Sequence, residues 1–159
     1  MIRLAPLALL GLLALTGVPA LSGCDSGEPD SCDSTAQFST EDLTPEGTTL
    51  GEAVEIGSCV GVDYVGRLAD GSGTFDEGSL TFFYSSNARL IPGFVLGMSG
   101  QRVGQTRRVV IPPSLGYGTR SREASAAAIE MGRVGIPSCS VLEFDITVTG
   151  VFQDARQCQ

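Results

Sequence analysis

Apolar and polar residues alternate along three segments of the chain, and a period of two indicates β-strands. The first segment spans residues 60–68 and is followed by a glycine-rich turn; the second spans residues 106–111 and ends at two prolines. In the third, residues 142–149, the apolar side chains fall on one face, at Leu142, Phe144, Ile146 and Val148. Because the other face of each strand is polar, the pattern predicts an antiparallel sheet with one face in water.

One segment has the period of a helix instead. Pro92 suits a first helical turn, Gly100 a stop, and apolar residues recur at i, i+3, i+4 and i+7, at Ile91, Phe94, Val95 and Met98. A second, alanine-rich helix is predicted over residues 122–131, ending at Gly132. The predicted fold class is α+β: one curved antiparallel sheet wrapped around one short amphipathic helix, with an extended loop before the last strand.

The N-terminus has the pattern of an export signal. Arg3 precedes an almost purely apolar run over residues 4–21, and Leu21-Ser22-Gly23-Cys24 resembles the bacterial lipobox, whose cysteine is acylated. The alternatives are an ordinary signal with an incidental cysteine, or an uncleaved anchor. We expect a lipoprotein signal peptide over residues 1–23 and an anchor at Cys24 on the periplasmic side of a bacterial envelope membrane.

The rest of the chain divides into a tether, a domain and a tail. Residues 24–36 are acidic, rich in serine and free of large apolar side chains, which is typical of a flexible tether. We expect one folded domain over residues 37–153 and a short tail over residues 154–159, because 159 residues suffice for one core.

Composition excludes several kinds of chemistry. The chain contains no histidine and no tryptophan, and all ten of its basic residues are arginine. Ser-His-Asp catalysis, His-ligated metals and lysine Schiff bases are therefore excluded, and we expect neither a metal nor a cofactor. A formal net charge of −8 argues against nucleic-acid binding.

Several motifs then occur in the order and spacing of a known family. Between residues 57 and 152 the chain resembles the FKBP family of peptidyl-prolyl cis–trans isomerases. The segments that carry the resemblance are Val62-Asp63-Tyr64-Val65-Gly66, Asp70-Gly71, Phe75-Asp76, Leu90-Ile91-Pro92-Gly93-Phe94, residues 98–105, residues 107–113, Leu115-Gly116-Tyr117-Gly118, Ile136-Pro137 and Leu142-Glu143-Phe144-Asp145.

The resemblance implies a proline pocket. Its catalytic set is Tyr64, Phe75, Asp76, Ile91, Tyr117 and Phe144, and its further substrate-binding residues are Leu90, Phe94 and Ile136. The alternative is that these are ordinary core residues, which for Phe144 and Ile91 is partly true. That alternative is weaker for Tyr64, Asp76 and Tyr117, because polar groups on an apolar surface need partners or a ligand.

In the implied mechanism, the apolar side chains hold the proline ring. The Ile91 N–H and the Tyr117 hydroxyl orient the flanking carbonyls, and Asp76 locks Tyr64 or another pocket group by a hydrogen bond. The implied partners are exported proline-containing polypeptides and, weakly, the family's macrolide inhibitors, with the chain acting as a monomer. The alternatives are a non-catalytic module that binds protein partners and a purely structural envelope lipoprotein.

Three features depart from the family's pattern. Phe94 stands where most members have tryptophan, which we expect to weaken rather than abolish activity. The family's next aromatic position falls near Thr81, although Phe82 or Phe83 could take its place. The loop over residues 118–136 is longer than in compact members, and we expect it to overhang the pocket rim.

Four cysteines remain once Cys24 is set aside. An even number in an exported chain suggests disulfides, with three possible connectivities, and free buried thiols are the alternative. The resemblance implies the pairs Cys59–Cys158 and Cys32–Cys139.

Overall fold

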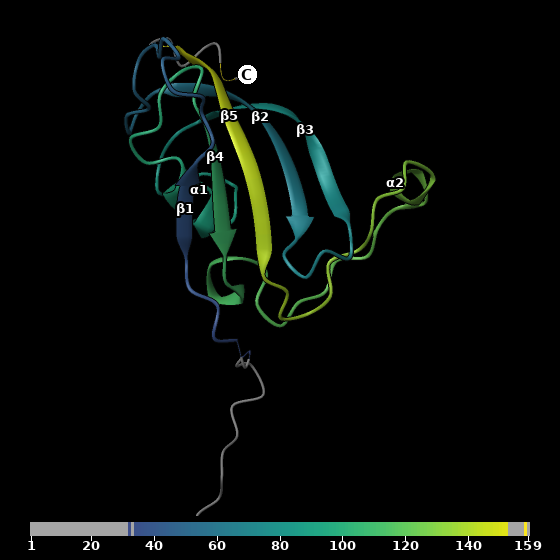
Figure 1. The fold of residues 1–159 in the computed structure, drawn as a ribbon. Coiled ribbons are helices and arrows are strands. Elements are labelled where there is room, and N and C mark those ends of the chain that lie inside the picture. Colours follow the sequence, from purple (N-terminus) through teal and green to yellow (C-terminus); the bar gives the residue numbers. More distant parts are fainter. Residues whose placement is uncertain (1–31, 33, 153–157, 159) are drawn as a thin grey trace, which may run out of the picture.

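A computed structural model describes Cys32, residues 34–152 and Cys158. The expected signal peptide, the acylated Cys24, most of the tether and most of the tail lie outside these residues. The described part forms a five-stranded antiparallel sheet in the order β1-β4-β5-β2-β3 (Figure 1). The strands are β1 (Ser39–Asp42), β2 (Cys59–Leu68), β3 (Thr74–Phe83), β4 (Thr106–Ile111) and β5 (Leu142–Phe152).

Within residues 34–152, three short helical segments accompany the sheet. These are α1 (Pro92–Gly97), the 3₁₀ turn η1 (Pro113–Leu115) and α2 (Ala126–Glu130). The helix α1 packs against β4, on the concave side of the curved sheet. The predicted α+β fold class is confirmed. None of the helices in the described part of the chain is long and apolar enough to cross a membrane.

The core follows the predicted alternation. The apolar face of β5 is almost completely buried, with Phe144 at 5% exposure and Leu142, Ile146 and Val148 at 0%. Phe94 and Met98 of the α1 region complete this core from the other side. The strand β3 was not predicted, because it is an edge strand with a mostly exposed middle and so lacks a clean alternation.

The helix α1 lies unusually close to β4 because two of its residues are glycines. Gly93 and Gly97 are both buried, and a Cβ atom added to Gly97 would lie 2.6 Å from Cγ2 of Val109. Val109 is itself 0% exposed and cannot move aside freely. Glycine at position 97 therefore fixes how near the helix comes to the sheet.

The second predicted helix is wrong over its first half. A helix over residues 122–131 was expected, but α2 covers only Ala126–Glu130. Arg122 instead forms an antiparallel bridge with Ile136, with both N···O distances at 2.7 Å. Ser125 then caps the helix, its hydroxyl accepting from the Ala128 N–H at 3.2 Å. The loop therefore leaves the domain as a two-stranded stalk, with α2 at its tip (Figure 1).

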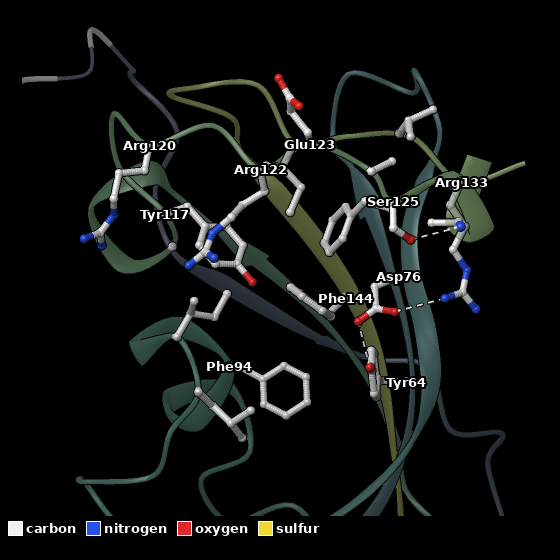
Figure 2. Close-up of a pocket in the computed structure, with 18 of the residues that line it drawn as sticks. Tyr64, Asp76, Phe94, Tyr117, Arg120, Arg122, Glu123, Ser125, Arg133 and Phe144 are labelled. Atoms are coloured by element: carbon white, nitrogen blue, oxygen red, sulfur yellow. Dashed lines mark hydrogen bonds and ion pairs between the residues drawn. The ribbon is translucent and has the colours of Figure 1, made fainter.

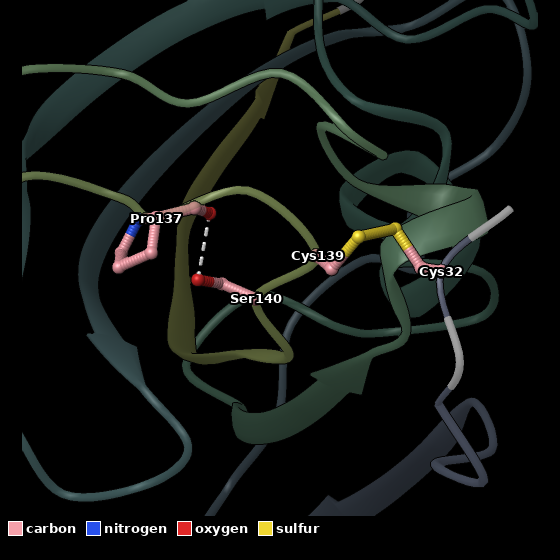
Figure 3. Close-up of a disulfide and its surroundings, with 4 residues drawn as sticks. All are labelled: Cys32, Pro137, Cys139 and Ser140. Carbon is pink, nitrogen blue, oxygen red and sulfur yellow. Dashed lines mark hydrogen bonds between the residues drawn. A yellow bond between two sulfur atoms is a disulfide. The ribbon is translucent and has the colours of Figure 1, made fainter. Parts of the chain in front are cut away.

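Two disulfides cross-link segments that are far apart in the sequence, in the connectivity that the family resemblance implies. Cys59 at the start of β2 is joined to Cys158, and Cys32 is joined to Cys139 (Figure 3). Cys139 has a left-handed backbone, with φ of 59°, and its N–H donates to the Gly118 carbonyl at 2.8 Å. The Cys32–Cys139 bond therefore anchors the base of the loop over residues 118–139.

Gly97→Ala tests the seating of α1. Alanine is the better helix former, so only the clash with Val109 can make this change harmful. We expect the free energy of unfolding to fall by about 1–3 kcal/mol in urea denaturation. Leu96→Ala, at a side chain that is 52% exposed on the same helix, serves as the control. A Gly97→Ala protein as stable as the wild type would contradict the described packing.

Candidate functional site

A cavity of about 760 Å³ opens between α1, the ends of β2 and β3, and the loop that follows η1. The structure brings all nine predicted pocket residues to its wall: Tyr64, Phe75, Asp76, Leu90, Ile91, Phe94, Tyr117, Ile136 and Phe144. They come from six separate stretches of sequence. Figure 2 shows the labelled members around the cavity.

Aromatic rings form the floor. Phe94 and Phe144 meet edge to face with their centroids 5.2 Å apart, and Phe75 meets Phe144 in the same way at 5.4 Å. Such T-shaped pairs match the positive ring edge to the negative ring face. The rings can approach β2 because Gly66 lacks a side chain: a Cβ there would lie 2.7 Å from the Phe75 ring and 2.8 Å from the Phe144 ring.

Thr81, Phe82 and Phe83 were the candidates for the family's next aromatic position. Phe82, rather than Thr81 or Phe83, packs beside Phe94, at a centroid distance of 6.5 Å. Phe83 is 45% exposed, and Thr81 lies opposite Gly61 on β2. Phe82 supports the floor from beneath rather than lining the cavity.

A chain of polar contacts fixes one wall. The Tyr64 hydroxyl donates to Oδ2 of Asp76 at 2.8 Å, and a guanidinium N–H of Arg133 donates to Oδ1 at 3.2 Å (Figure 2). Partial burial, and then the hydrogen bond to Asp76, raise the pKa of Tyr64 to about 12. The phenol is therefore a neutral donor at physiological pH, and Asp76 serves as a fixed acceptor.

Two other donors belong to residues that line the cavity and have no partner among the described residues. Ile91 precedes α1 in an extended conformation, and its N–H makes no hydrogen bond to any residue that the structure describes. The Tyr117 hydroxyl likewise has none within residues 34–152. The Tyr117 ring is held by the Arg122 guanidinium, which lies 4.9 Å from the ring centroid.

Part of the site was missed at the sequence level. The loop predicted to overhang the rim does line the cavity, through Arg120, residues 122–125, Ala128, Arg133 and Val134. Arg133 reaches both Asp76 and Glu77, and the Val134 N–H donates to the Thr74 carbonyl at 3.0 Å. No sequence motif marks these contacts, because they depend on how the segment after α2 packs against β3. Within the described residues no group of three or more Cys, Asp or Glu side chains could hold a metal ion.

Comparison with known proteins agrees with this geometry. Residues 51–149 match the family described as FKBP-type peptidyl-prolyl cis-trans isomerase. Over 107 residues the chain is 36% identical to "FK506-binding protein 3" of Debaryomyces hansenii, covering 65% of this chain and 22% of that protein. Over 111 residues it is 35% identical to the protein of the same name from Yarrowia lipolytica, covering 67% of this chain and 24% of that protein. The chain belongs to the FKBP-type peptidyl-prolyl cis–trans isomerase family.

Solved structures show the same fold. FkpA from Escherichia coli is 28% identical with a TM-score of 0.54, covering 79% of this chain and 53% of that one. AtFKBP13 is 30% identical with a TM-score of 0.55, covering 71% of this chain and 91% of that one. The chain spans less than a quarter of the length of the two curated relatives named above.

The Tyr64 hydroxyl gives a pH-dependent signature. Its pKa is raised to about 12 in the folded protein, against about 10 for an unfolded tyrosine. The neutral phenol therefore stabilises the fold below pH 10, and this contribution is lost as the pH rises through about 12. We expect ultraviolet titration of the folded protein to show a tyrosine ionising near pH 12, and Tyr64→Phe to remove it.

Tyr84→Phe is the control for this titration. Burial also raises the pKa of Tyr84, but Tyr84 lies outside the cavity and its hydroxyl donates to the Val95 carbonyl. The ionisation near pH 12 should persist in that variant. If Tyr64→Phe removed an ionisation near pH 10 and left the one near pH 12, the described burial and hydrogen bonding of Tyr64 would be contradicted.

Proposed function

We propose that this chain catalyses cis–trans isomerisation of Xaa-Pro bonds in exported proteins while anchored to a membrane through an acylated Cys24. One observation carries the proposal: an aromatic-floored cavity is lined by two residues with donors that are unused among the described residues, the Ile91 N–H and the Tyr117 hydroxyl. Such a site suits a proline ring flanked by two peptide carbonyls.

The chemistry requires no acid, base or nucleophile. The Xaa-Pro bond rotates over a barrier of about 18–20 kcal/mol because resonance gives it double-bond character. At the twisted geometry that resonance is lost and the carbonyl oxygen carries less charge, so an apolar cup favours the twisted state over the planar one. Phe75, Phe94, Phe144 and Ile136 form that cup.

The polar groups act by orientation. The Ile91 N–H and the Tyr117 hydroxyl hold the carbonyls on either side of the rotating bond. Asp76 acts as a positioning residue, because it fixes the Tyr64 hydroxyl at 2.8 Å and is itself held by Arg133. This division of roles is consistent with a chain that lacks histidine.

Phe94 determines how fast we expect the site to turn over and how tightly we expect it to bind inhibitors. A phenyl ring fills less of the floor than an indole would, but Phe144 and Phe82 pack against Phe94 on two sides. We therefore propose an active enzyme that turns over more slowly, and binds the family's macrolide inhibitors more weakly, than members with tryptophan.

Export and anchoring rest on the N-terminal pattern. An apolar run over residues 4–21 is followed by the lipobox-like Leu21-Ser22-Gly23-Cys24. Two disulfides in the domain suit an oxidising compartment. With residues 25–31 between the acylated cysteine and the disulfide at Cys32, the domain would stay near the membrane surface.

The catalytic assignment predicts the effect of two substitutions. The full chain in a non-ionic detergent should isomerise Xaa-Pro peptides in exchange NMR, which needs no coupling protease. Tyr117→Phe should lower kcat/KM by about 3–10-fold, the value of one hydrogen bond. Phe75→Ala should lower it by about tenfold or more, since the cup loses a wall.

Phe83→Ala is the matched control, because Phe83 lies on the same strand as Phe75 but points away from the cavity lining. Unchanged activity in folded Tyr117→Phe and folded Phe75→Ala would refute the assignment. A wild-type protein that binds the peptides without isomerising them would identify a non-catalytic binding module instead.

The anchor predicts a separate result. In a bacterial host supplied with radiolabelled palmitate, the wild-type chain should be labelled and sediment with membranes. Cys24→Ser should remain unlabelled, because serine lacks the thiol that carries the acyl chain. Ser22→Ala, which keeps a small residue in the lipobox, should be labelled as the wild type is. An unlabelled wild-type chain would overturn the anchor.

A further inference from the structure

The cavity wall is positively charged in a protein that is acidic overall. Four of the ten arginines line it: Arg89, Arg120, Arg122 and Arg133. Among the residues that the structure describes, only two carboxylates do so, those of Asp76 and Glu123. Four guanidinium groups against two carboxylates leave a surplus of two positive charges, while the whole chain has a formal net charge of −8.

One of these arginines is already paired. Arg133 lies 3.2 Å from Asp76 and 3.6 Å from Glu77, and its side chain is only 19% exposed. Its role is to hold the loop and Asp76 in place. The carboxylate of Asp76 is therefore taken by Arg133 and Tyr64, and it does not neutralise the other arginines of the wall.

The other three arginines have no such partner. Within residues 34–152, the guanidinium groups of Arg89, Arg120 and Arg122 make neither an ion pair nor a hydrogen bond. On the opposite face of the sheet, by contrast, Arg67 and Arg108 each lie 2.7 Å from Asp145. Three of the four arginines of the cavity wall are thus unpaired among the described residues, whereas Arg67 and Arg108 on the opposite face are paired.

The orientation of two loop residues strengthens the contrast. Figure 2 shows the Arg122 guanidinium beside the Tyr117 ring at the mouth of the cavity, whereas the Glu123 carboxylate points away from it. Stacking on the ring restricts Arg122 before any ligand arrives, so a carboxylate that binds there costs less ordering entropy. The nearest acidic side chain is turned away from the position where it would compete.

From this arrangement we infer that the pocket selects prolines with an aspartate or glutamate next to them in the sequence. The inference rests on the proposed function, which places the proline ring on the aromatic floor and its flanking carbonyls at Ile91 and Tyr117. Side chains on either side of that proline then project toward the rim, where Arg89, Arg120 and Arg122 lie. Carboxylates pair with guanidinium groups, and lysine or arginine at the same positions would be repelled.

The acidity of the rest of the protein does not cancel this preference. At physiological ionic strength the field of a surface charge is screened over about 8 Å. The local arginines therefore determine which residues bind beside the proline, while the distant acidic surface acts only weakly there.

The test compares peptides that differ in one charge. The full chain in non-ionic detergent is given two peptide sets in exchange NMR, with Glu, Gln or Arg immediately before the proline in one set and immediately after it in the other. In at least one set, kcat/KM for the Glu peptide should exceed that for the Gln peptide by about fivefold, with the Arg peptide lowest. Raising the salt to about 0.5 M should reduce this ratio toward one.

Two charge-removing variants locate the effect. Arg89→Gln and Arg120→Gln together should bring the Glu/Gln ratio close to one. Arg102→Gln removes one positive charge from an exposed position outside the cavity wall and should leave the ratio unchanged. A ratio that falls equally in Arg102→Gln would contradict a local site.

The two proposals fail in different ways. If Gln peptides are isomerised but the wild-type Glu/Gln ratio is one or less in both sets, the acidic preference is wrong and the isomerase stands. If no peptide is isomerised, the proposed activity fails. The affinities of the Glu and Gln peptides, measured as chemical-shift changes in the same samples, then decide the acidic preference, and equal affinities overturn it.

Discussion

The close packing of α1 on β4 is the constraint on which the pocket depends. Gly93 and Gly97 let the helix sit directly on Ile111 and Val109, with no side chain between them. At that separation Phe94 is buried to 3% exposure and meets the Phe144 ring of β5 at 5.2 Å. The same seating places Ile91, just before the helix, on the cavity wall. The contact between α1 and β4 thus positions both the aromatic floor and Ile91.

The loop after η1 adds a second, separable part of the site. Its base is held by the Cys32–Cys139 bond and by the Arg122–Ile136 bridge. The segment after α2 is held to β3 through Arg133 and Val134. The sheet and α1 supply the apolar floor, and the loop supplies most of the cavity's charge. We propose that the floor binds the proline ring and that the loop selects among prolines by the residues next to them.

Much of this organisation could be predicted from the chain alone. The strands β2, β4 and β5 each have one buried and one more exposed face, so their apolar and polar residues alternate recognisably. The family motifs contain residues that do meet around one cavity. The edge strand β3 is exposed along its middle and has no such period. The start of α2 was misjudged because helix propensity at residues 122–125 is overridden by the bridge to Ile136. The contacts of Arg133 arise only from tertiary folding.

The central claim is that a proline ring occupies this cavity with the Ile91 N–H donating to the peptide. The most direct test is an NMR titration of the isotope-labelled protein with an Xaa-Pro peptide. Our account predicts that the Ile91 amide moves downfield on binding, as a newly hydrogen-bonded N–H does, together with shifts of the Phe75 and Phe144 ring signals. Shifts confined to exposed side chains of the loop tip, such as Ile129, with the Ile91 amide and both rings unmoved, would contradict it.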